Sequence, residues 1–183
     1  MPTPLNTPLF CHPASPCNAV QTIEASATLT DDGLTLRYCV YGDPAAISLP
    51  EPHPAQAADG LWQHTCCEAF IASVEGAAYR EFNFSPSGEW AAYGFTGYRE
   101  RDTAYTSPCA PRIELRQHAA GFELTAALAS DLLPAGPEWQ IGLTAVIETS
   151  DGSKSYWALA HAAAQPDFHL RPSFSLILKA AHP

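Results

Sequence analysis

Basic residues are scarce in this chain of 183 residues. It has 9 Lys and Arg against 19 Asp and Glu, which gives a formal net charge of −10 at pH 7. The four arginines between residues 99 and 116 are interleaved with acidic residues and form no basic patch. Because nucleic acids and anionic membranes bind clustered positive charge, the composition argues against both as partners.

Long hydrophobic runs are also missing. No stretch approaches the ~20 apolar residues that a membrane-spanning helix needs. The N-terminal residues MPTPLNTPLFCHPASPC lack the basic and continuous apolar segments of a secretory signal. We therefore expect a cytoplasmic location.

The motifs of several enzyme and metal-site classes are absent. The sequence has no Gly-rich phosphate loop, no Gly-x-Ser-x-Gly elbow and no His-Glu-x-x-His. Its six cysteines include no Cys-x-x-Cys pair, so we expect free thiols. These absences leave no residue with an assigned catalytic role and no expected metal centre.

Helical periodicity longer than about two turns is lacking, and short alternating runs take its place. Residues 20–29 and 34–40 alternate apolar and polar side chains around Asp31-Asp32-Gly33, a tight-turn signal that predicts a hairpin. Similar runs recur along the chain. Eight or nine short strands with turn signals predict an all-β fold, an antiparallel β-sandwich.

The length fits a single domain. Residues 1–18 are rich in proline and show no periodicity, so we expect an irregular lead-in followed by the sandwich domain over residues 19–183. Residues 42–60 hold four prolines and predict a long loop with a functional role.

The stretch from residue 61 to 101 holds three strand-like runs and most of the polar and aromatic residues. In its middle run, Tyr79, Glu81, Asn83 and Ser85 should share one face of a strand, with the phenylalanines at 82 and 84 on the other. The turn Ser-Pro-Ser-Gly that follows predicts a partner strand over residues 90–95.

The candidate ligand-binding residues are polar and aromatic residues of this stretch and of an irregular segment near the C-terminus, residues 161–172, together with Trp157 just before that segment. Indole rings can stack on the apolar face of a sugar while Glu, Asn and His side chains pair with its hydroxyl groups. For any single Trp, a core position is the commoner role. The candidates are Trp62, His64, Glu68, Glu81, Asn83, Trp90, Tyr93, Trp157, His161, Asp167 and His169.

Glu68 lies in phase with apolar residues of its run, which predicts an acidic side chain on an inward-looking face. Such a carboxyl group must be paired, protonated or bound to a cation. Arg80, Arg99 or a histidine could pair with it. Alternatively, Glu68 and Glu81 could form an acid/base pair like that of a glycosidase.

The late segment offers imidazole and carboxylate groups at His161, Asp167 and His169. With His64 they could complete a zinc site with three protein ligands. Their spacing matches no metal motif, so we expect these histidines to make structural hydrogen bonds.

The segments LWQHTCCEAFI, YREFNFSPSGEWAAYGF, YWALAH and PDFH, in that order, resemble the bacterial DOMON-like domains related to family-nine carbohydrate-binding modules. The resemblance extends from about Val20 to Leu178. It implies a β-sandwich whose relatives bind sugars or haem and are mostly not enzymes.

Three functional hypotheses follow. The first is a non-catalytic module that binds a carbohydrate or sugar-like small molecule, with Trp62, Trp90, Tyr93 and Trp157 as stacking surfaces. The second is a haem-binding domain with His161 or His169 as axial ligand. The resemblance implies a methionine as axial ligand of the haem-binding relatives. The sole methionine here is Met1, outside the expected fold, so haem would need two histidines, or His and Lys. The third is a small hydrolase or isomerase that uses Glu68 and Glu81.

Overall fold

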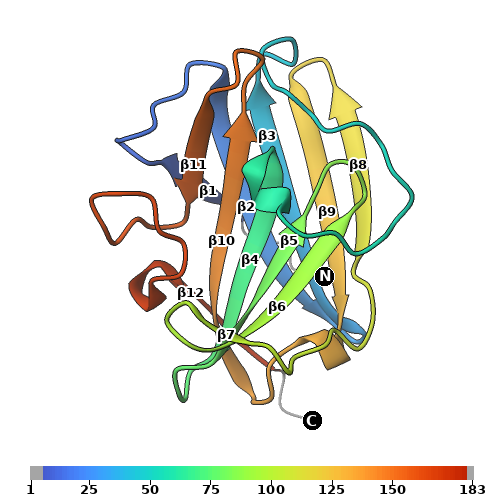
Figure 1. The fold of residues 1–183 in the computed structure, drawn as a ribbon, viewed down its shortest axis with the longest axis vertical. Coiled ribbons are helices and arrows are strands. Elements are labelled where there is room, and N and C mark those ends of the chain that lie inside the picture. Colours follow the sequence, from blue (N-terminus) through green and yellow to red (C-terminus); the bar gives the residue numbers. More distant parts are fainter. Residues whose placement is uncertain (1–5, 181–183) are drawn as a thin grey trace.

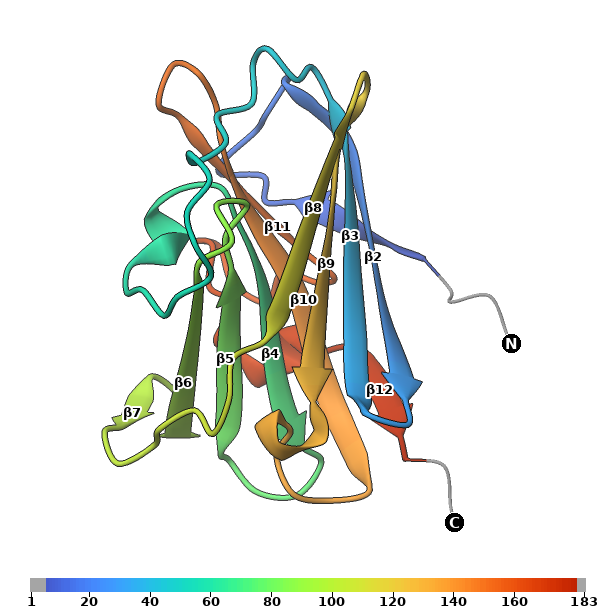
Figure 2. The ribbon, with the colours of Figure 1, turned by 90° about the vertical axis from the view of Figure 1, so that its right-hand side faces the viewer.

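The computed structural model describes residues 6–180. Its chain forms two antiparallel β-layers that pack face to face (Figures 1 and 2). We call the layer that carries β4, β5 and β6 the front sheet, and the opposite layer the rear sheet. The predicted antiparallel β-sandwich is confirmed.

The front sheet has the order β7-β6-β5-β4-β10-β11, and β12 also pairs with β10. Its strands are β4 (Cys66–Ser73), β5 (Tyr79–Phe84), β6 (Trp90–Gly97), β7 (Glu100–Asp102), β10 (Glu138–Glu148), β11 (Lys154–Ala158) and β12 (Leu176–Lys179). The rear sheet has the order β2-β3-β9-β8. Its strands are β2 (Val20–Thr30), β3 (Gly33–Gly42), β8 (Arg112–His118) and β9 (Gly121–Ala129).

Strand β1 (Thr7–Cys11) joins the two layers, because it pairs with β2 on one side and with β11 on the other. The prediction of irregular chain over residues 1–18 is therefore wrong for residues 7–11. The five residues of β1 are too short a run to display alternation, and their partners come from distant parts of the chain. Residues 1–5 and 181–183 lie outside the described part.

Two predicted turns are confirmed. The hairpin between β2 and β3 reverses at Asp31-Asp32-Gly33, where Gly33 has a φ of 145° that L-residues rarely adopt. Between β5 and β6, the Gly88 amide donates to the Ser85 carbonyl at 3.0 Å, and Gly88 has a φ of 95°.

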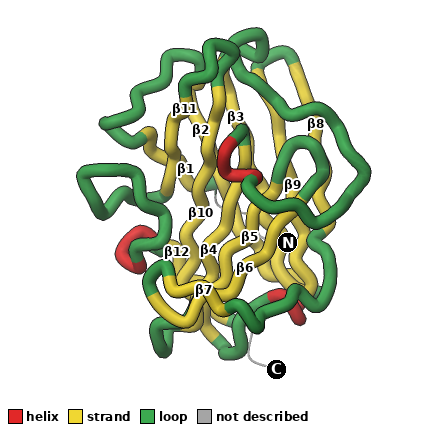
Figure 3. Tube along the Cα trace, in the orientation of Figure 1, coloured by secondary structure: helices red, strands yellow, loops and turns green. Residues whose placement is uncertain are grey.

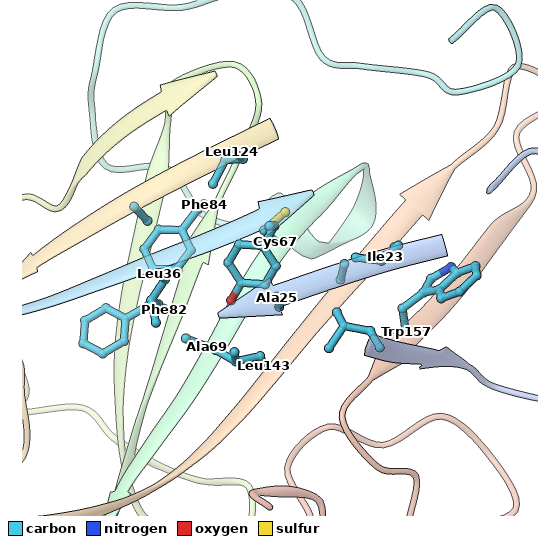
Figure 4. Close-up of a cluster of buried hydrophobic side chains, with 14 of the residues drawn as sticks. Ile23, Ala25, Leu36, Cys67, Ala69, Phe82, Phe84, Leu124, Leu143 and Trp157 are labelled. Carbon is cyan, nitrogen blue, oxygen red and sulfur yellow. The ribbon is translucent and has the colours of Figure 1, made fainter. Parts of the chain in front are cut away.

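The main core lies between the two layers (Figure 4). Phe82 and Phe84 of β5 pack there with Leu36 of β3 and Leu124 of β9, and all four are fully buried. Burial of each such side chain stabilises the fold by about 1.5–3 kcal/mol. This packing fixes which face of β5 points away from the core.

A second apolar cluster covers the outer face of the front sheet. Phe70, Tyr79, Phe95, Phe168 and Phe174 belong to it and are buried. Strand β4 is therefore buried on both faces, although its alternation alone predicts one core face. Two long segments supply much of this cover: residues 43–65 and 159–175, drawn in Figure 3 as green loops except for a short red turn in each.

Three 3₁₀ turns complete the described chain: η1 (Leu61–Gln63), η2 (Ser130–Leu132) and η3 (Arg171–Ser173). Turn η1 lies over the outer face of the front sheet (Figures 1 and 2). No helix within residues 6–180 combines the length and apolar character needed to cross a membrane.

Candidate functional site

A cavity of about 360 Å³, partly open to solvent, lies on the outer face of the front sheet. Its floor comes from β4, β5, β6 and β10, and its walls come from η1, the β6–β7 turn and the loop after β11. Aromatic and charged side chains line it together. They are Trp62, Glu68, Phe70, Glu81, Tyr93, Phe95, Arg99, Arg101, Val146, Tyr156, Pro166, Phe168 and His169.

Strand β5 supplies the polar floor by simple alternation. Phe82 packs in the main core, whereas Glu81 lines the cavity on the opposite face. Asn83, on the same face as Glu81, donates its side-chain amide to Glu81 Oε1 at 2.8 Å. The predicted division of β5 into a polar face and a phenylalanine face is confirmed.

Glu68 lies beside this pair on the neighbouring strand β4, directly opposite Asn83 of β5. It is 2% exposed. Its Oε2 accepts a 3.4 Å hydrogen bond from Thr144, and its Oε1 has no hydrogen-bond partner among the described residues. Burial raises the pKa of Glu68 well above its usual value, and the nearby charge of Glu81 raises it further.

The surroundings of Glu68 differ from the sequence-based prediction in two ways. The side chain faces the loop-covered outer side of the front sheet, because Cys67 and Ala69 are the β4 residues in the main core. Arg80 does not pair with it but donates to the backbone carbonyls of Asp131 and Leu132. The carboxyl group is thus buried without a cationic partner.

Glu81 has more partners than Glu68. Burial raises its pKa, while the Asn83 hydrogen bond and the positive charges of Arg101 and Arg99 oppose that rise. Its Oε2 lies 3.7 Å from His169 Nε2. Of the two carboxyl groups, Glu68 therefore holds its proton more firmly.

His169 packs between Phe70 and Phe95, with ring centroids 5.1 Å from each. Its Nδ1 is hydrogen-bonded to the Tyr79 hydroxyl at 2.8 Å. Burial, with a smaller contribution from the positive charge of Arg99, lowers the pKa of His169 to about 4. The imidazole is therefore neutral at pH 7 and adds no positive charge beside Glu81.

Arg99 of the β6–β7 turn and Arg101 of β7 line the cavity. Arg99 Nη2 donates to Asp167 Oδ1 at 3.0 Å, and the Tyr98 hydroxyl donates to Asp167 Oδ2 at 2.5 Å. Arg99 has a φ of 56°, the left-handed conformation that costs a non-glycine residue about 1 kcal/mol or more. Arg101 is exposed, and its guanidinium lies 3.7 Å from the centroid of the Tyr93 ring.

Trp62 forms the aromatic edge of the cavity. Turn η1 leaves it 39% exposed, with its ring centroid 6.0 Å from that of Tyr93 at an angle of 75°. The Tyr93 hydroxyl donates to Asp59, which belongs to the long loop predicted over residues 42–60. That loop also pairs with the start of β6, where Trp90 NH donates to the Gln56 carbonyl.

The structure brings five of the eleven candidate residues to the cavity lining, namely Trp62, Glu68, Glu81, Tyr93 and His169. Two more contact a lining residue: Asn83 binds Glu81, and Asp167 binds Arg99.

Four candidates lie elsewhere. Trp157 packs in the main core, and its indole NH donates to Ser155. Trp90 is absent from the lining and is held by the 43–60 loop. His64 pairs with Glu148 at 2.7 Å, and His161 Nε2 is hydrogen-bonded to the Phe10 carbonyl.

Several lining residues were not among the candidates. Phe70 and Phe95 alternate in phase with Glu68 and Tyr93 on the same strands, so the strand period could have identified them. Arg99 and Arg101 stand at the end of the central stretch. Tyr156, Phe168 and Pro166 come from segments whose position depends on tertiary packing, and no local signal marks them.

The histidines do not assemble the metal or haem ligand sets considered from the sequence. His64, His161 and His169 each have a separate partner, and within residues 6–180 no group of three or more His, Cys, Asp or Glu side chains could hold a metal ion. Only His169 lines the cavity. The two candidate axial ligands, His161 and His169, therefore do not face the same cavity.

Comparison with known proteins supports the fold. The sequence matches no protein-family model and no curated protein at a significant level. A solved structure from Bacteroides uniformis, described as a "putative carbohydrate-binding protein", matches with a TM-score of 0.65 over 97% of this chain and 87% of that chain. Sequence identity is 13%, so this likeness establishes the shared β-sandwich fold.

Proposed function

We propose that this protein is a non-catalytic binding domain for a carbohydrate or sugar-like small molecule, and that it belongs among the DOMON-like domains related to family-nine carbohydrate-binding modules. The ligand occupies the cavity on the outer face of the front sheet. The observation that carries the proposal is the exposed indole of Trp62 beside Tyr93, in the same cavity as two buried carboxyl groups.

This arrangement suits the two-sided chemistry of a sugar. The apolar face of a pyranose ring stacks on an aromatic ring, and Trp62 has the exposure to accept it. On the other side, Glu81 accepts hydrogen bonds from hydroxyl groups, and protonated Glu68 can donate one. A volume of about 360 Å³ is near the small end of the ~300–1,000 Å³ typical of ligand pockets, which favours a small saccharide.

The solved structure from Bacteroides uniformis adds support, since the described carbohydrate-binding role of that protein is of the same kind. The sequence resemblance points in the same direction. Neither identifies the sugar.

Titration of the full chain with mono- and disaccharides, followed by ligand-observed NMR and calorimetry, tests the proposal. We expect a Kd between about 1 μM and 1 mM for at least one sugar. Trp62→Ala should weaken binding at least about tenfold, by loss of a stacking contact. Phe10→Ala is the matched control, because Phe10 is 58% exposed and does not line the cavity. Absence of binding by every mono- and disaccharide tested at millimolar concentration would overturn the proposal.

A second candidate function, hydrolase or isomerase, is favoured by one observation. Glu68 and Glu81 face the same cavity, and both pKa values are raised. A general acid near neutral pH needs such a shift. Turnover of nitrophenyl glycosides that falls at least about 100-fold in Glu81→Gln would favour catalysis over binding alone.

A further inference from the structure

One buried oxygen atom of the cavity lacks a hydrogen-bond partner. Glu68 is 2% exposed and lines the cavity, and its Oε1 is without a partner among the described residues. A buried polar atom in that state is destabilising, because no hydrogen bond offsets the loss of its contact with water. A ligand that donates a hydrogen bond to Glu68 Oε1 would remove this destabilisation. The atom therefore indicates that the ligand carries a hydrogen-bond donor.

The groups that face Glu68 leave its charge uncompensated. Glu81 and Asn83 face it from β5, Thr144 from β10, and the Cys66 thiol lies two residues away on β4. None of these is a cation, and Glu81 adds a second negative charge. An incoming positive charge would therefore be stabilised here.

The groups around Glu81 include positive charge, but most of it is already engaged. Arg99 is paired with Asp167, and His169 is neutral at pH 7. Asp59 of the 43–60 loop, which accepts a hydrogen bond from the Tyr93 hydroxyl, brings further negative charge. Arg101 is the remaining cation, and it is exposed and stacked over Tyr93. The floor of the cavity thus presents two carboxyl groups, with one unpaired cation at its rim.

The walls favour a cation as well. Phe70, Tyr93, Tyr156 and Phe168 all line the cavity. The face of an aromatic ring attracts a nearby ammonium group, more strongly when water is excluded. Because an ammonium group has three N–H donors, it can serve Glu68 and Glu81 together, whereas a hydroxyl group has one donor.

Building on the proposed function, we propose that the ligand is an amino sugar whose protonated amino group binds between Glu68 and Glu81, with Glu68 Oε1 as one acceptor. The aromatic walls surround the ammonium group, and Trp62 stacks on the sugar ring. Because the ammonium group favours the ionised form of both carboxyl groups, binding displaces the proton held by Glu68.

Calorimetric titration of the full chain at pH 6.5 compares glucosamine, N-acetylglucosamine, glucose and cyclohexylamine. Glucosamine is expected to bind at least about tenfold more tightly than the two neutral sugars, since a hydrogen bond between charged groups is stronger than a neutral one. Glu68→Gln should remove that preference. Glu75→Gln, which makes the same substitution in an exposed turn, should preserve it.

Proton release gives a test that needs no variant. The binding enthalpy of glucosamine to the wild-type protein should depend on the ionisation enthalpy of the buffer, as release of part of a proton requires.

Thermal unfolding of Glu68→Gln establishes that the variant folds.

The outcomes separate the two proposals. Equal affinity for glucosamine, N-acetylglucosamine and glucose, or a binding enthalpy that is independent of the buffer, would overturn the amino-sugar inference and leave sugar binding intact. Binding of cyclohexylamine but of neither glucosamine nor the neutral sugars would overturn the amino-sugar inference. Absence of binding across the whole mono- and disaccharide panel would overturn both proposals.

Discussion

The Asn83 side-chain amide donates a 2.8 Å hydrogen bond to Glu81, two positions earlier on the same face of β5. A shift of the strand register by one residue would exchange the faces of every side chain. The phenylalanine at position 82 is fully buried on the opposite face. The position of the polar cavity floor is therefore fixed by the packing of the main core beneath it.

Replacement of Asn83 by alanine should lower the free energy of unfolding by about 1–3 kcal/mol, because buried Glu81 loses its hydrogen-bond donor. Urea unfolding at pH 7 measures this change. Asn6→Ala is the matched control: the Asn6 side chain also donates to a glutamate, but at an exposed site, and its loss should cost less than about 0.5 kcal/mol. Equal effects of the two substitutions would contradict the structural role of Asn83.

Phe82→Ala should lower the free energy of unfolding by about 3–5 kcal/mol, since it opens a cavity in the main core. Phe10→Ala, at a 58% exposed position, should change it by less than about 0.5 kcal/mol. Denaturant unfolding of both variants decides the matter. A small effect at position 82 would mean that β5 does not pack as described.

His169 should make the protein less stable in acid. Its pKa is lowered from 6.5 to about 4 in the folded state, so the unfolded chain binds the proton more readily between these values. Stability contributed by the neutral ring is present above pH 6.5 and is lost as the pH falls toward 4. His169→Gln should therefore lose less stability than the wild type over this range. Parallel pH profiles of the two proteins would contradict the burial of the imidazole.

Substitution of Trp157 should mainly affect stability, whereas substitution of Trp62 should mainly affect sugar binding. Trp157→Ala is expected to lower the free energy of unfolding by about 3–5 kcal/mol, because Trp157 packs in the main core. Trp62→Ala should change stability by less than about 1 kcal/mol, because its ring is 39% exposed, and should weaken sugar binding. Calorimetric unfolding and a sugar titration of each variant separate these roles. A stability loss in Trp62→Ala as large as that in Trp157→Ala would place Trp62 in the core.

The parts of the fold that depend on local chemistry could be predicted from the sequence. The alternation of β5 gives its two faces, and Asp31-Asp32-Gly33 gives the first hairpin, because side-chain period and turn conformation are set by a few neighbouring residues. The concentration of polar and aromatic residues in two segments also identified five residues of the cavity lining.

Features that depend on distant packing could not be predicted in this way. Trp62 and Trp157 both stand in polar and aromatic segments, yet one lies at the cavity and the other in the main core. Glu68 faces the outer side of the front sheet because Cys67 and Ala69 pack in the main core, and that outer side is covered in part by residues 159–175, which are far from Glu68 in sequence. The presence of Phe168 in the cavity lining likewise depends on how that loop packs against the front sheet.

The central claim is that the cavity on the outer face of the front sheet binds a sugar. An amide-resolved NMR titration of the full chain with glucosamine tests it most directly. We predict saturable shift changes concentrated at Trp62, Glu68, Glu81, Tyr93 and His169, with the amides of β8 and β9 in the rear sheet unaffected. Shift changes confined to the rear sheet, or none at millimolar sugar, would contradict the account.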